Sequence, residues 1–237
     1  MKIIKDYVIS ILKPKCNICD RDIDGSSLNL YICPDCYNSL LHFENDENCS
    51  ICAHPLIEGK CPSCYKLGKI YFDSFRTLGY YREMNKKIIY KLKKEQYSKM
   101  NNIIIDALIQ KQILKYDMNI CVIPDAITDR IKKGAAGMTG FGALLKKKGF
   151  KVNNFLEKRI SESFKKQKYS KKRERFDDVK NKFYIGQVDI SKIDRVLLID
   201  DIYTSGSTLN YCSGILKMIG IKEVHCVSFF RNILRIA

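Results

Sequence analysis

The 237-residue sequence contains no run of about 18 apolar residues, the length a helix needs to cross a membrane. Its N-terminal apolar stretch is broken by Lys5 and Asp6, and no small-residue cleavage site follows, so we expect no secretion leader. The sequence also lacks the G-x-x-x-x-G-K-[ST] motif, which excludes a P-loop ATPase. These absences predict a cytoplasmic protein with no membrane span.

Acidic residues are scarce and unevenly distributed. The chain has 26 Asp and Glu against 42 Lys and Arg, which gives a formal charge of +16. Residues 1–70 hold 8 basic and 9 acidic residues, whereas residues 71–237 hold 34 and 17. The excess positive charge therefore lies entirely in the second part, and it predicts a polyanionic partner. We expect two domains, residues 1–70 and residues 71–237.

Eight of the eleven cysteines form four C-x-x-C pairs in the first part of the chain. A C-x-x-C turn directs two thiolates to one point, and two such turns make the four-sulfur site that Zn²⁺ favours. We predict two zinc ions paired in chain order, although an interleaved arrangement would use the same residues. Disulfides, an iron–sulfur cluster and a thioredoxin-like redox centre are the alternatives. The predicted metal ligands are Cys16, Cys19, Cys33, Cys36, Cys49, Cys52, Cys61 and Cys64.

Residues 196–208 predict a phosphate site. Val196 to Ile199 are apolar and indicate a strand buried on both faces of a parallel sheet. Two acids and a segment rich in hydroxyls and glycine follow, and then a helical pattern begins. Backbone N–H groups at a helix N-terminus favour phosphate, and the acids lie where ribose hydroxyls or hydrated Mg²⁺ would bind. The predicted phosphate and ribose site consists of Asp200, Asp201, Thr204, Ser205, Gly206, Ser207 and Thr208.

Strands and helices alternate along the rest of the chain. Strands are expected at residues 71–81, 120–123, 154–156 and 223–230, and helices at 1–12, 34–43, 84–94, 97–114 and 141–148, before a basic end at 231–235. This alternation predicts an open α/β sheet whose ligand binds at the carboxyl ends of the strands.

Residues 196–208 resemble the phosphoribosyl-pyrophosphate (PRPP) motif of type I phosphoribosyltransferases, and the whole chain resembles the ComF family. Further matching features are Pro14 before the first cysteine pair, Pro124 after a short strand, and the spacing of Gln167, Arg175, Val179 and Phe183. The resemblance implies a phosphoribosyltransferase-like open parallel sheet flanked by helices, preceded by a small zinc-ribbon domain. It also implies an association with DNA uptake during natural competence.

Two segments depart from the family pattern. The family's Arg-Gly-Phe-Asn-Gln aligns with Lys-Gly-Ala-Ala-Gly at residues 133–137, and the Asn of its Arg-x-x-Asn segment is Asp178 here. Both changes remove side-chain amides that could hydrogen-bond to a ligand. No residue is identified as the base that would activate a nucleophile, so catalytic residues stay unassigned and we expect a binding role.

Residues 165–175 predict a contact with nucleic acid, because seven of these eleven residues are basic: Lys165, Lys166, Lys168, Lys171, Lys172, Arg173 and Arg175. Tyrosines are interleaved with lysines elsewhere, at Tyr80, Tyr81, Tyr90, Tyr97 and Tyr169. Lysines follow phosphates and aromatic rings stack on bases, which favours single-stranded DNA as the partner. PRPP, accompanied by Mg²⁺, or a nucleotide phosphate would occupy the pocket. An active phosphoribosyltransferase of nucleotide salvage and a zinc-dependent adaptor for DNA uptake or recombination proteins are the two alternatives.

Overall fold

The computed structural model describes residues 14–23, 30–41, 48–94, 97–125, 137–158, 183–186 and 189–233. The predicted helix at residues 1–12 and the basic segment at residues 165–175 lie outside these ranges. None of the described helices combines the length and the apolar character needed to cross a lipid bilayer.

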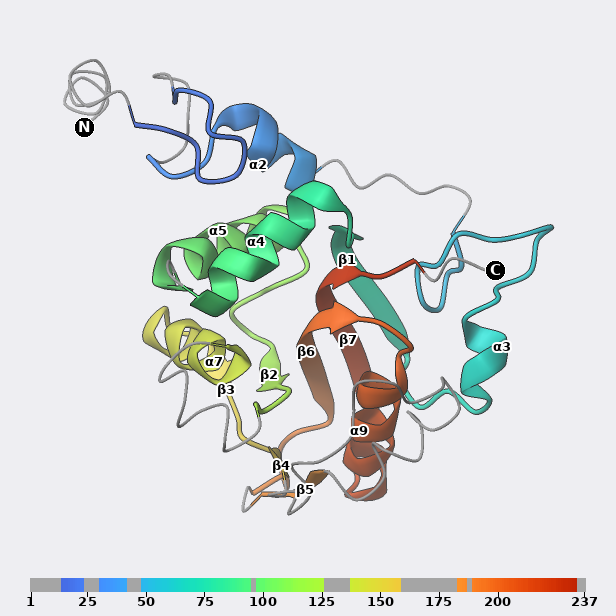
Figure 1. Cartoon of the computed structure of the whole chain (residues 1–237). Coiled ribbons are helices and arrows are strands. Elements are labelled where there is room, and N and C mark those ends of the chain that lie inside the picture. The colour runs from blue at the N-terminus through green and yellow to red at the C-terminus, as the bar shows by residue number, and fades with distance from the viewer. Residues whose placement is uncertain are drawn as a thin grey trace, which may run out of the picture.

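A five-stranded parallel sheet forms the centre of the protein, with the strands in the order β1-β7-β6-β2-β3 (Figure 1). Its strands are β1 (Ser74–Tyr80), β2 (Asn119–Val122), β3 (Lys151–Val152), β6 (Arg195–Tyr203) and β7 (Glu223–Arg231). A separate antiparallel pair is formed by β4 (Leu156–Lys158) and β5 (Phe183–Ile185). Because the five strands are parallel, their carboxyl ends all lie on the same side of the sheet. We call this side the carboxyl edge.

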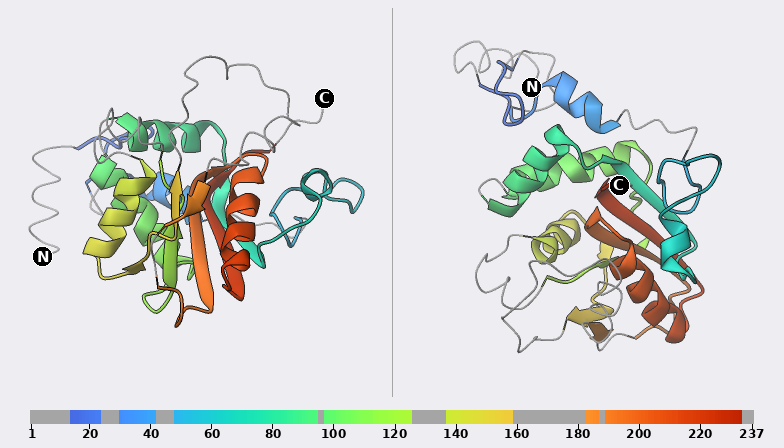
Figure 2. Two further views of the ribbon diagram at one scale, coloured as in Figure 1. Left: turned by 90° about the horizontal axis from the view of Figure 1, so that it is seen from below. Right: turned by 45° about the vertical axis from the view of Figure 1, so that its right-hand side comes forward.

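Helices cover both faces of the sheet (Figures 1 and 2). Helices α4 (Glu83–Lys94), α5 (Tyr97–Gln110) and α7 (Met138–Lys147) lie on one face, and α9 (Ser207–Met218) lies on the other. The shorter helices α2 (Pro34–Leu41) and α3 (Cys64–Leu67) belong to the cysteine-rich region. The predicted open parallel sheet flanked by helices is therefore confirmed.

Strand β6 is buried on both faces, as its apolar run predicts. Val196 and Leu198 pack in the core under α9, whereas Leu197 and Ile199 pack in the core under α4, α5 and α7. All four are at most 4% exposed. A parallel strand covered by helices on both sides needs apolar side chains at every position, which explains the unbroken run.

Two strands extend further than their sequence patterns predict. Strand β6 continues through both aspartates to Tyr203, and β7 continues to Arg231, because these two residues pair in register and extend the ladder of backbone hydrogen bonds. The expectation that Arg231 begins a basic end is wrong, since its side chain is fully buried. Helix α5 ends at Gln110 rather than at residue 114, and Gln112 then adopts a positive φ of 53° as the chain turns.

The cysteine-rich region contacts both faces of the sheet domain. Its first four cysteine positions share an apolar core with α4 and α5, and its second four share a core with α9. The Tyr37 hydroxyl donates to Gln110 Oε1 at 3.0 Å, and Lys87 Nζ donates to the Ile18 carbonyl at 3.3 Å. The two cysteine groups therefore lie on opposite sides of the sheet (Figure 1). A boundary near residue 70 between two domains stays a prediction.

We predict that Leu198→Ala lowers the free energy of unfolding by about 2–5 kcal/mol, because it leaves a cavity where a completely buried side chain was packed. Met218→Ala is the control, since the side chain of Met218 is 87% exposed and its truncation should change stability by less than about 0.5 kcal/mol. Urea denaturation followed by circular dichroism measures both. Equal effects of the two substitutions would contradict the placement of β6 at the centre of the sheet.

Candidate metal centres and phosphate site

The first candidate metal centre brings together the thiols of Cys16, Cys19, Cys33 and Cys36, whose sulfur atoms all lie within 4.8 Å of one another. The first two come from a tight turn closed by an isolated bridge between Lys15 and Asp22, and the last two lie at the start of α2. Burial raises the pKa of the Cys19 thiol, but the hydrogen bond from Arg21 Nε at 3.4 Å opposes this effect, and the pKa falls to about 6. A low pKa favours the thiolate, the form that binds metal.

The second candidate metal centre brings together Cys49, Cys52, Cys61 and Cys64 in the same way. The Sγ–Sγ distances are 3.7 Å between Cys49 and Cys64 and 3.5 Å between Cys52 and Cys61. The pKa of the Cys52 thiol is lowered to about 5 by its hydrogen bond with Cys64 and, against the effect of burial, by the positive charge of Arg231. Cys52 therefore favours the thiolate, whereas burial raises the pKa of the Cys61 thiol and the hydrogen bond with Cys52 raises the pKa of the Cys64 thiol.

Both thiol groups fit zinc. All eleven cysteines lie in the described residues, and none of them is in a disulfide. Four sulfur ligands in a compact cluster are the donor set that a structural Zn²⁺ ion takes. The structure groups the ligands in chain order, as predicted, and not in the interleaved order. His54 is not a member of either group, since its Nδ1 lies 2.7 Å from the Pro55 carbonyl oxygen.

The candidate phosphate site lies where β6 ends and α9 begins. Asp200 Oδ1 accepts a hydrogen bond from the backbone N–H of Asp201 at 2.9 Å, and Asp201 Oδ1 accepts one from Ile202 at 2.7 Å. The hydroxyls of Ser205 and Ser207 lie 2.8 Å apart. Both aspartates remain partly exposed at the carboxyl edge of the sheet. The structure thus brings the predicted acids and hydroxyls to one edge, and phosphate binding by them stays a prediction.

Gly206 is the N-cap residue of α9 and has a left-handed conformation with a φ of 81°. A Cβ atom at this position would overlap the ring and hydroxyl of Tyr203, so only glycine fits. Gly206 has no side chain that could cap α9, and the Ser205 hydroxyl accepts a hydrogen bond from the backbone N–H of Ser207 at 3.3 Å. The next N–H groups of the first turn, those of Thr208 and Leu209, lie at the positive end of the helix dipole and can donate to an anion.

Helix α7 has a different N-terminus. Asp125 Oδ2 accepts a hydrogen bond from the backbone N–H of Thr139 at 2.8 Å, and the carboxylate lies against Gly137, where a Cβ would be 2.7 Å from it. An acid thus already lies beside the first turn of this helix. The α9 N-terminus is consequently the better candidate for phosphate.

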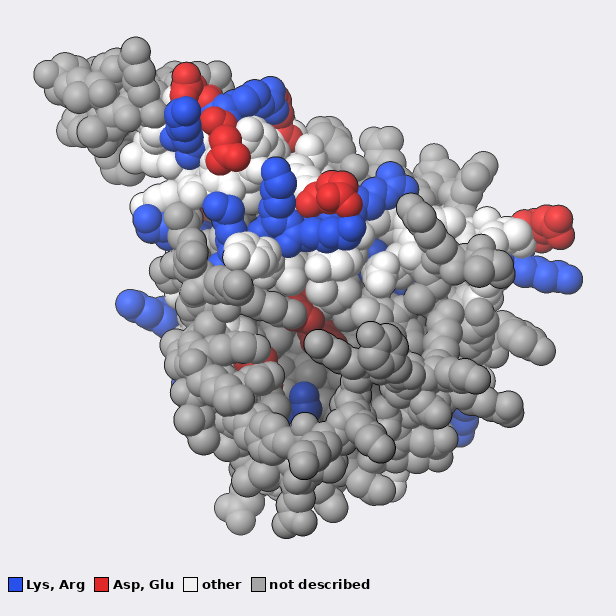
Figure 3. Space-filling model, viewed as in Figure 1, with Lys and Arg blue, Asp and Glu red and all other residues white. Residues whose placement is uncertain are grey.

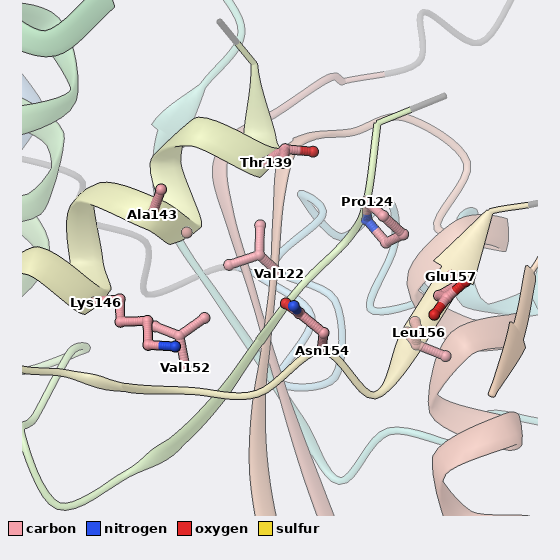
Figure 4. A pocket seen from close by; sticks show the side chains of 10 residues that line it. Val122, Pro124, Thr139, Ala143, Lys146, Val152, Asn154, Leu156 and Glu157 are labelled. Atoms are coloured by element: carbon pink, nitrogen blue, oxygen red, sulfur yellow. The ribbon is translucent and has the colours of Figure 1, made fainter. Parts of the chain in front are cut away.

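A larger pocket of about 430 Å³ lies between α7, β2, β3 and β4 (Figure 4). Its wall is partly apolar, with Val122 and Val152, and its polar groups include Lys146, Asn154 and Glu157. The Glu157 carboxylate accepts a hydrogen bond from the Tyr184 hydroxyl at 2.6 Å. Its volume and mixed lining are typical of small-molecule sites. The sequence did not predict this pocket, because its lining residues come from four separate elements.

The sequence also did not predict two buried polar residues near the phosphate site. Asn210 in α9 hydrogen-bonds to the backbone of Lys69 and Tyr71, and Arg231 contacts Cys52. Their partners lie 139 to 179 positions away in the sequence, so no local pattern could reveal them. The basic residues predicted to bind nucleic acid, from Lys165 to Arg175, lie outside the described residues.

The chain is similar in sequence to a known competence protein. It is 28% identical over 203 residues to "Competence protein ComFC" of Streptococcus pneumoniae (strain ATCC BAA-255 / R6), and the alignment covers 84% of this chain and 87% of the relative. No family model matches the chain. The similarity agrees with the resemblance carried by the cysteine pairs and by residues 196–208.

We predict that the purified chain holds two zinc ions, measured by elemental mass spectrometry. The double change of Cys19 and Cys33 to serine should leave one ion, because both residues belong to the first centre. The double change of Cys19 and Cys61 to serine should leave no zinc ion, because it removes one ligand from each centre. Cys121→Ala should keep two ions, since Cys121 belongs to neither cluster. An interleaved arrangement would instead lose both ions in the first double variant.

Proposed function

Because the chain belongs to the ComF family, as its similarity to ComFC and its two four-cysteine clusters support, we propose that it is an accessory protein of natural competence that handles single-stranded DNA. In this proposal α4 binds the sugar–phosphate backbone, and the loop after β6 binds a terminal nucleotide phosphate or PRPP. The observation that carries the proposal is a basic helix face beside a phosphate-type loop.

The basic surface follows α4. Lys and Arg side chains gather over this helix in the space-filling view (Figure 3). Its described cations are Arg82, Lys86, Lys87 and Lys91, and Glu83 is the one acid in the helix. Cations spaced along one helix face can follow the phosphates of a single strand, and the released counterions make such binding strongly dependent on salt.

The helix also offers an aromatic ring and a route to the loop. Tyr90 is 55% exposed on α4, which suits stacking against a base. Ile89 and Leu92, on the inner side of α4, line a small hollow together with Asp201 of β6. A single DNA strand that follows the outer face of α4 would thus reach the carboxyl edge of the sheet, where the phosphate loop lies.

The loop can bind an anion through several groups of this chain. The first turn of α9 supplies backbone N–H donors, and the hydroxyls of Thr204, Ser205 and Thr208 lie at the same edge. Asp200 and Asp201 would accept hydrogen bonds from ribose hydroxyls or bind a hydrated Mg²⁺ that accompanies PRPP. Mg²⁺ would neutralise pyrophosphate charge, and the rest of the binding would come from these side chains and the helix.

Phosphoribosyl transfer is a second candidate function, favoured by the sequence and position of this loop. It would require a group that activates a nucleophile at the anomeric carbon of the sugar. No described side chain is identified in that role. Pyrophosphate release from PRPP in the presence of each nucleobase tests this candidate, and turnover that Asp201→Asn abolishes would support it.

We predict that the chain binds single-stranded oligothymidine, and that log K falls linearly with log salt concentration. Replacing both Lys86 and Lys91 with glutamine should reduce this slope by about 1.4, since each phosphate contact on a single strand contributes about 0.7. Lys192→Gln is the control, because Lys192 is exposed in the turn before β6, at the opposite edge of the sheet. Fluorescence anisotropy measures all three proteins.

The same titrations can contradict the proposal. Affinity that is undetectable at low salt, or that does not change with salt, would eliminate DNA binding by this surface. Equal slopes for the α4 variant and for Lys192→Gln would place any binding elsewhere on the chain.

We predict that Gly206→Ala weakens PRPP binding in the presence of Mg²⁺ at least tenfold, because the added methyl group would displace Tyr203 and the first turn of α9. Gly149→Ala is the matched control, since Gly149 also has a positive φ, of 92°, but no described atom lies within 4 Å of the position that its Cβ would take. The control should bind PRPP within about twofold of the unchanged chain. Isothermal titration calorimetry measures both. Unchanged affinity for Gly206→Ala would remove the loop from the binding site.

A further inference from the structure

Arg231 is a buried cation at the carboxyl end of β7. Its side chain is completely buried, and Nη2 donates to Cys52 Sγ of the second metal centre at 3.5 Å. Its Nε and Nη1 atoms have no hydrogen-bond partner among the described residues. The guanidinium carbon lies 4.1 Å from the centroid of the Tyr203 ring. A guanidinium with one hydrogen bond and one ring contact is poorly compensated if the neighbouring thiols are neutral.

The negative charge of a metal-bound second centre compensates the positive charge of the buried guanidinium. Four thiolates around one divalent metal ion carry a net charge of −2, and Arg231 is the positive group against them. The buried guanidinium contacts this centre directly through Cys52 Sγ, so its positive charge offsets the negative charge of the metal-bound thiolates. Arg231 therefore favours the metal-bound form of this centre.

The first centre has no comparable arginine among the described residues. Its neighbour Arg21 contacts Cys19 but has a side chain that is 61% exposed and pairs with Asp35 at 2.9 Å. Water screens an exposed pair of this kind, so it contributes little to stability. The two centres thus differ in how strongly a neighbouring cation supports them.

Tyr203 connects Arg231 to the phosphate loop. Tyr203 is 1% exposed, and its ring contacts both the guanidinium and Phe75, whose ring centroid is 4.6 Å away. The hydroxyl end of Tyr203 lies against Gly206, where a Cβ would overlap it. Tyr203 and Arg231 are also paired strand residues, and the N–H of Asn232 donates to the Tyr203 carbonyl at 2.8 Å. A displacement of Arg231 would therefore move Tyr203, and through Tyr203 it would change the position of Gly206.

A second contact joins the same cysteine region to the loop. Asn210, completely buried in the first turn of α9, donates to the Lys69 carbonyl at 2.8 Å and accepts from the Tyr71 N–H at 2.8 Å. Its own N–H donates to the Gly206 carbonyl at 2.9 Å. The chain leaving the second centre is thus fixed to the helix turn that would bind phosphate.

We propose that Arg231 is a positioning residue that couples the second metal centre to the phosphate loop, so that metal binding at Cys49, Cys52, Cys61 and Cys64 and phosphate binding at residues 204–208 strengthen each other. The proposal rests on the proposed phosphate site for its second half only. The first half, that Arg231 holds the metal ion of the second centre, stands without any ligand. Since such coupling is reciprocal, it can be measured from either site.

The first test measures zinc release from the full chain to a coloured chelator. Two ions should leave, and Arg231→Gln should accelerate the release of one of them about 10- to 100-fold, the usual effect of removing a neighbour that supports a metal ligand. Arg231→Lys, which keeps the charge, should restore much of the slow release. Arg21→Gln, the matched change at the first centre, should accelerate the release of that ion much less, because Arg21 is exposed and water screens its charge. Unchanged release of both ions in Arg231→Gln would overturn the proposal.

A second variant covers the case in which Arg231→Gln does not fold. Tyr203→Leu removes the ring on which the guanidinium lies, whereas Tyr203→Phe keeps it and removes only the hydroxyl. Faster zinc release in Tyr203→Leu than in Tyr203→Phe is expected. Equal release rates in the two variants would contradict the role of the ring.

The second test adds PRPP and Mg²⁺ to the unchanged chain during zinc release. Saturating PRPP should slow the loss of the ion that Arg231→Gln affects and leave the other ion unaffected. If PRPP binds, as seen by calorimetry, but neither ion is slowed, the coupling is wrong and the phosphate site stands. If PRPP does not bind at all, the proposed function of the loop fails, and the assigned role of Arg231 in holding the metal is judged by the first test alone.

Discussion

The charge of Arg231, buried between a cluster of thiols and an aromatic ring, is the interaction on which the carboxyl edge of the sheet depends. Strands β1, β6 and β7 end at this edge, where the Tyr81 N–H donates to the Arg231 carbonyl and Tyr203 pairs with Arg231. A guanidinium in such a place is stable only beside compensating negative charge. The second four-cysteine centre supplies that charge when it holds a metal ion, so the metal supports the sheet edge as well as its own loop.

This arrangement gives the cysteine-rich region a role in positioning. The two clusters contact opposite faces of the sheet domain, and the chain that follows the second cluster is hydrogen-bonded at Lys69 and Tyr71 to Asn210 in the first turn of α9. A phosphate loop needs its backbone N–H groups held in place before the anion arrives, because ordering them on binding would cost affinity. Basic residues gather over α4, whose inner residues Ile89 and Leu92 border Asp201, and this is consistent with a partner that carries many phosphates.

Much of this architecture could be predicted from the sequence, for physical reasons that are local. The cysteine pairs are recognisable because each C-x-x-C turn forms within four residues, and β6 is recognisable because burial on both faces demands a continuous apolar run. Arg231 was expected at a basic end of the chain, since nothing nearby in the sequence shows that a thiol and a ring contact it. Asn210 and the pocket lined by Lys146, Asn154 and Glu157 were missed for the same reason.

A crystal structure of the full chain with PRPP and Mg²⁺ would examine the phosphate loop and the second metal centre together. We expect phosphate at the N-terminus of α9, within hydrogen-bond distance of residues 204–208, and a metal ion in the second centre with Arg231 against its thiolates. PRPP bound away from α9, for example in the pocket beside Lys146, would contradict the assigned role of the loop. A metal-loaded second centre from which Arg231 has turned away would contradict the coupling equally.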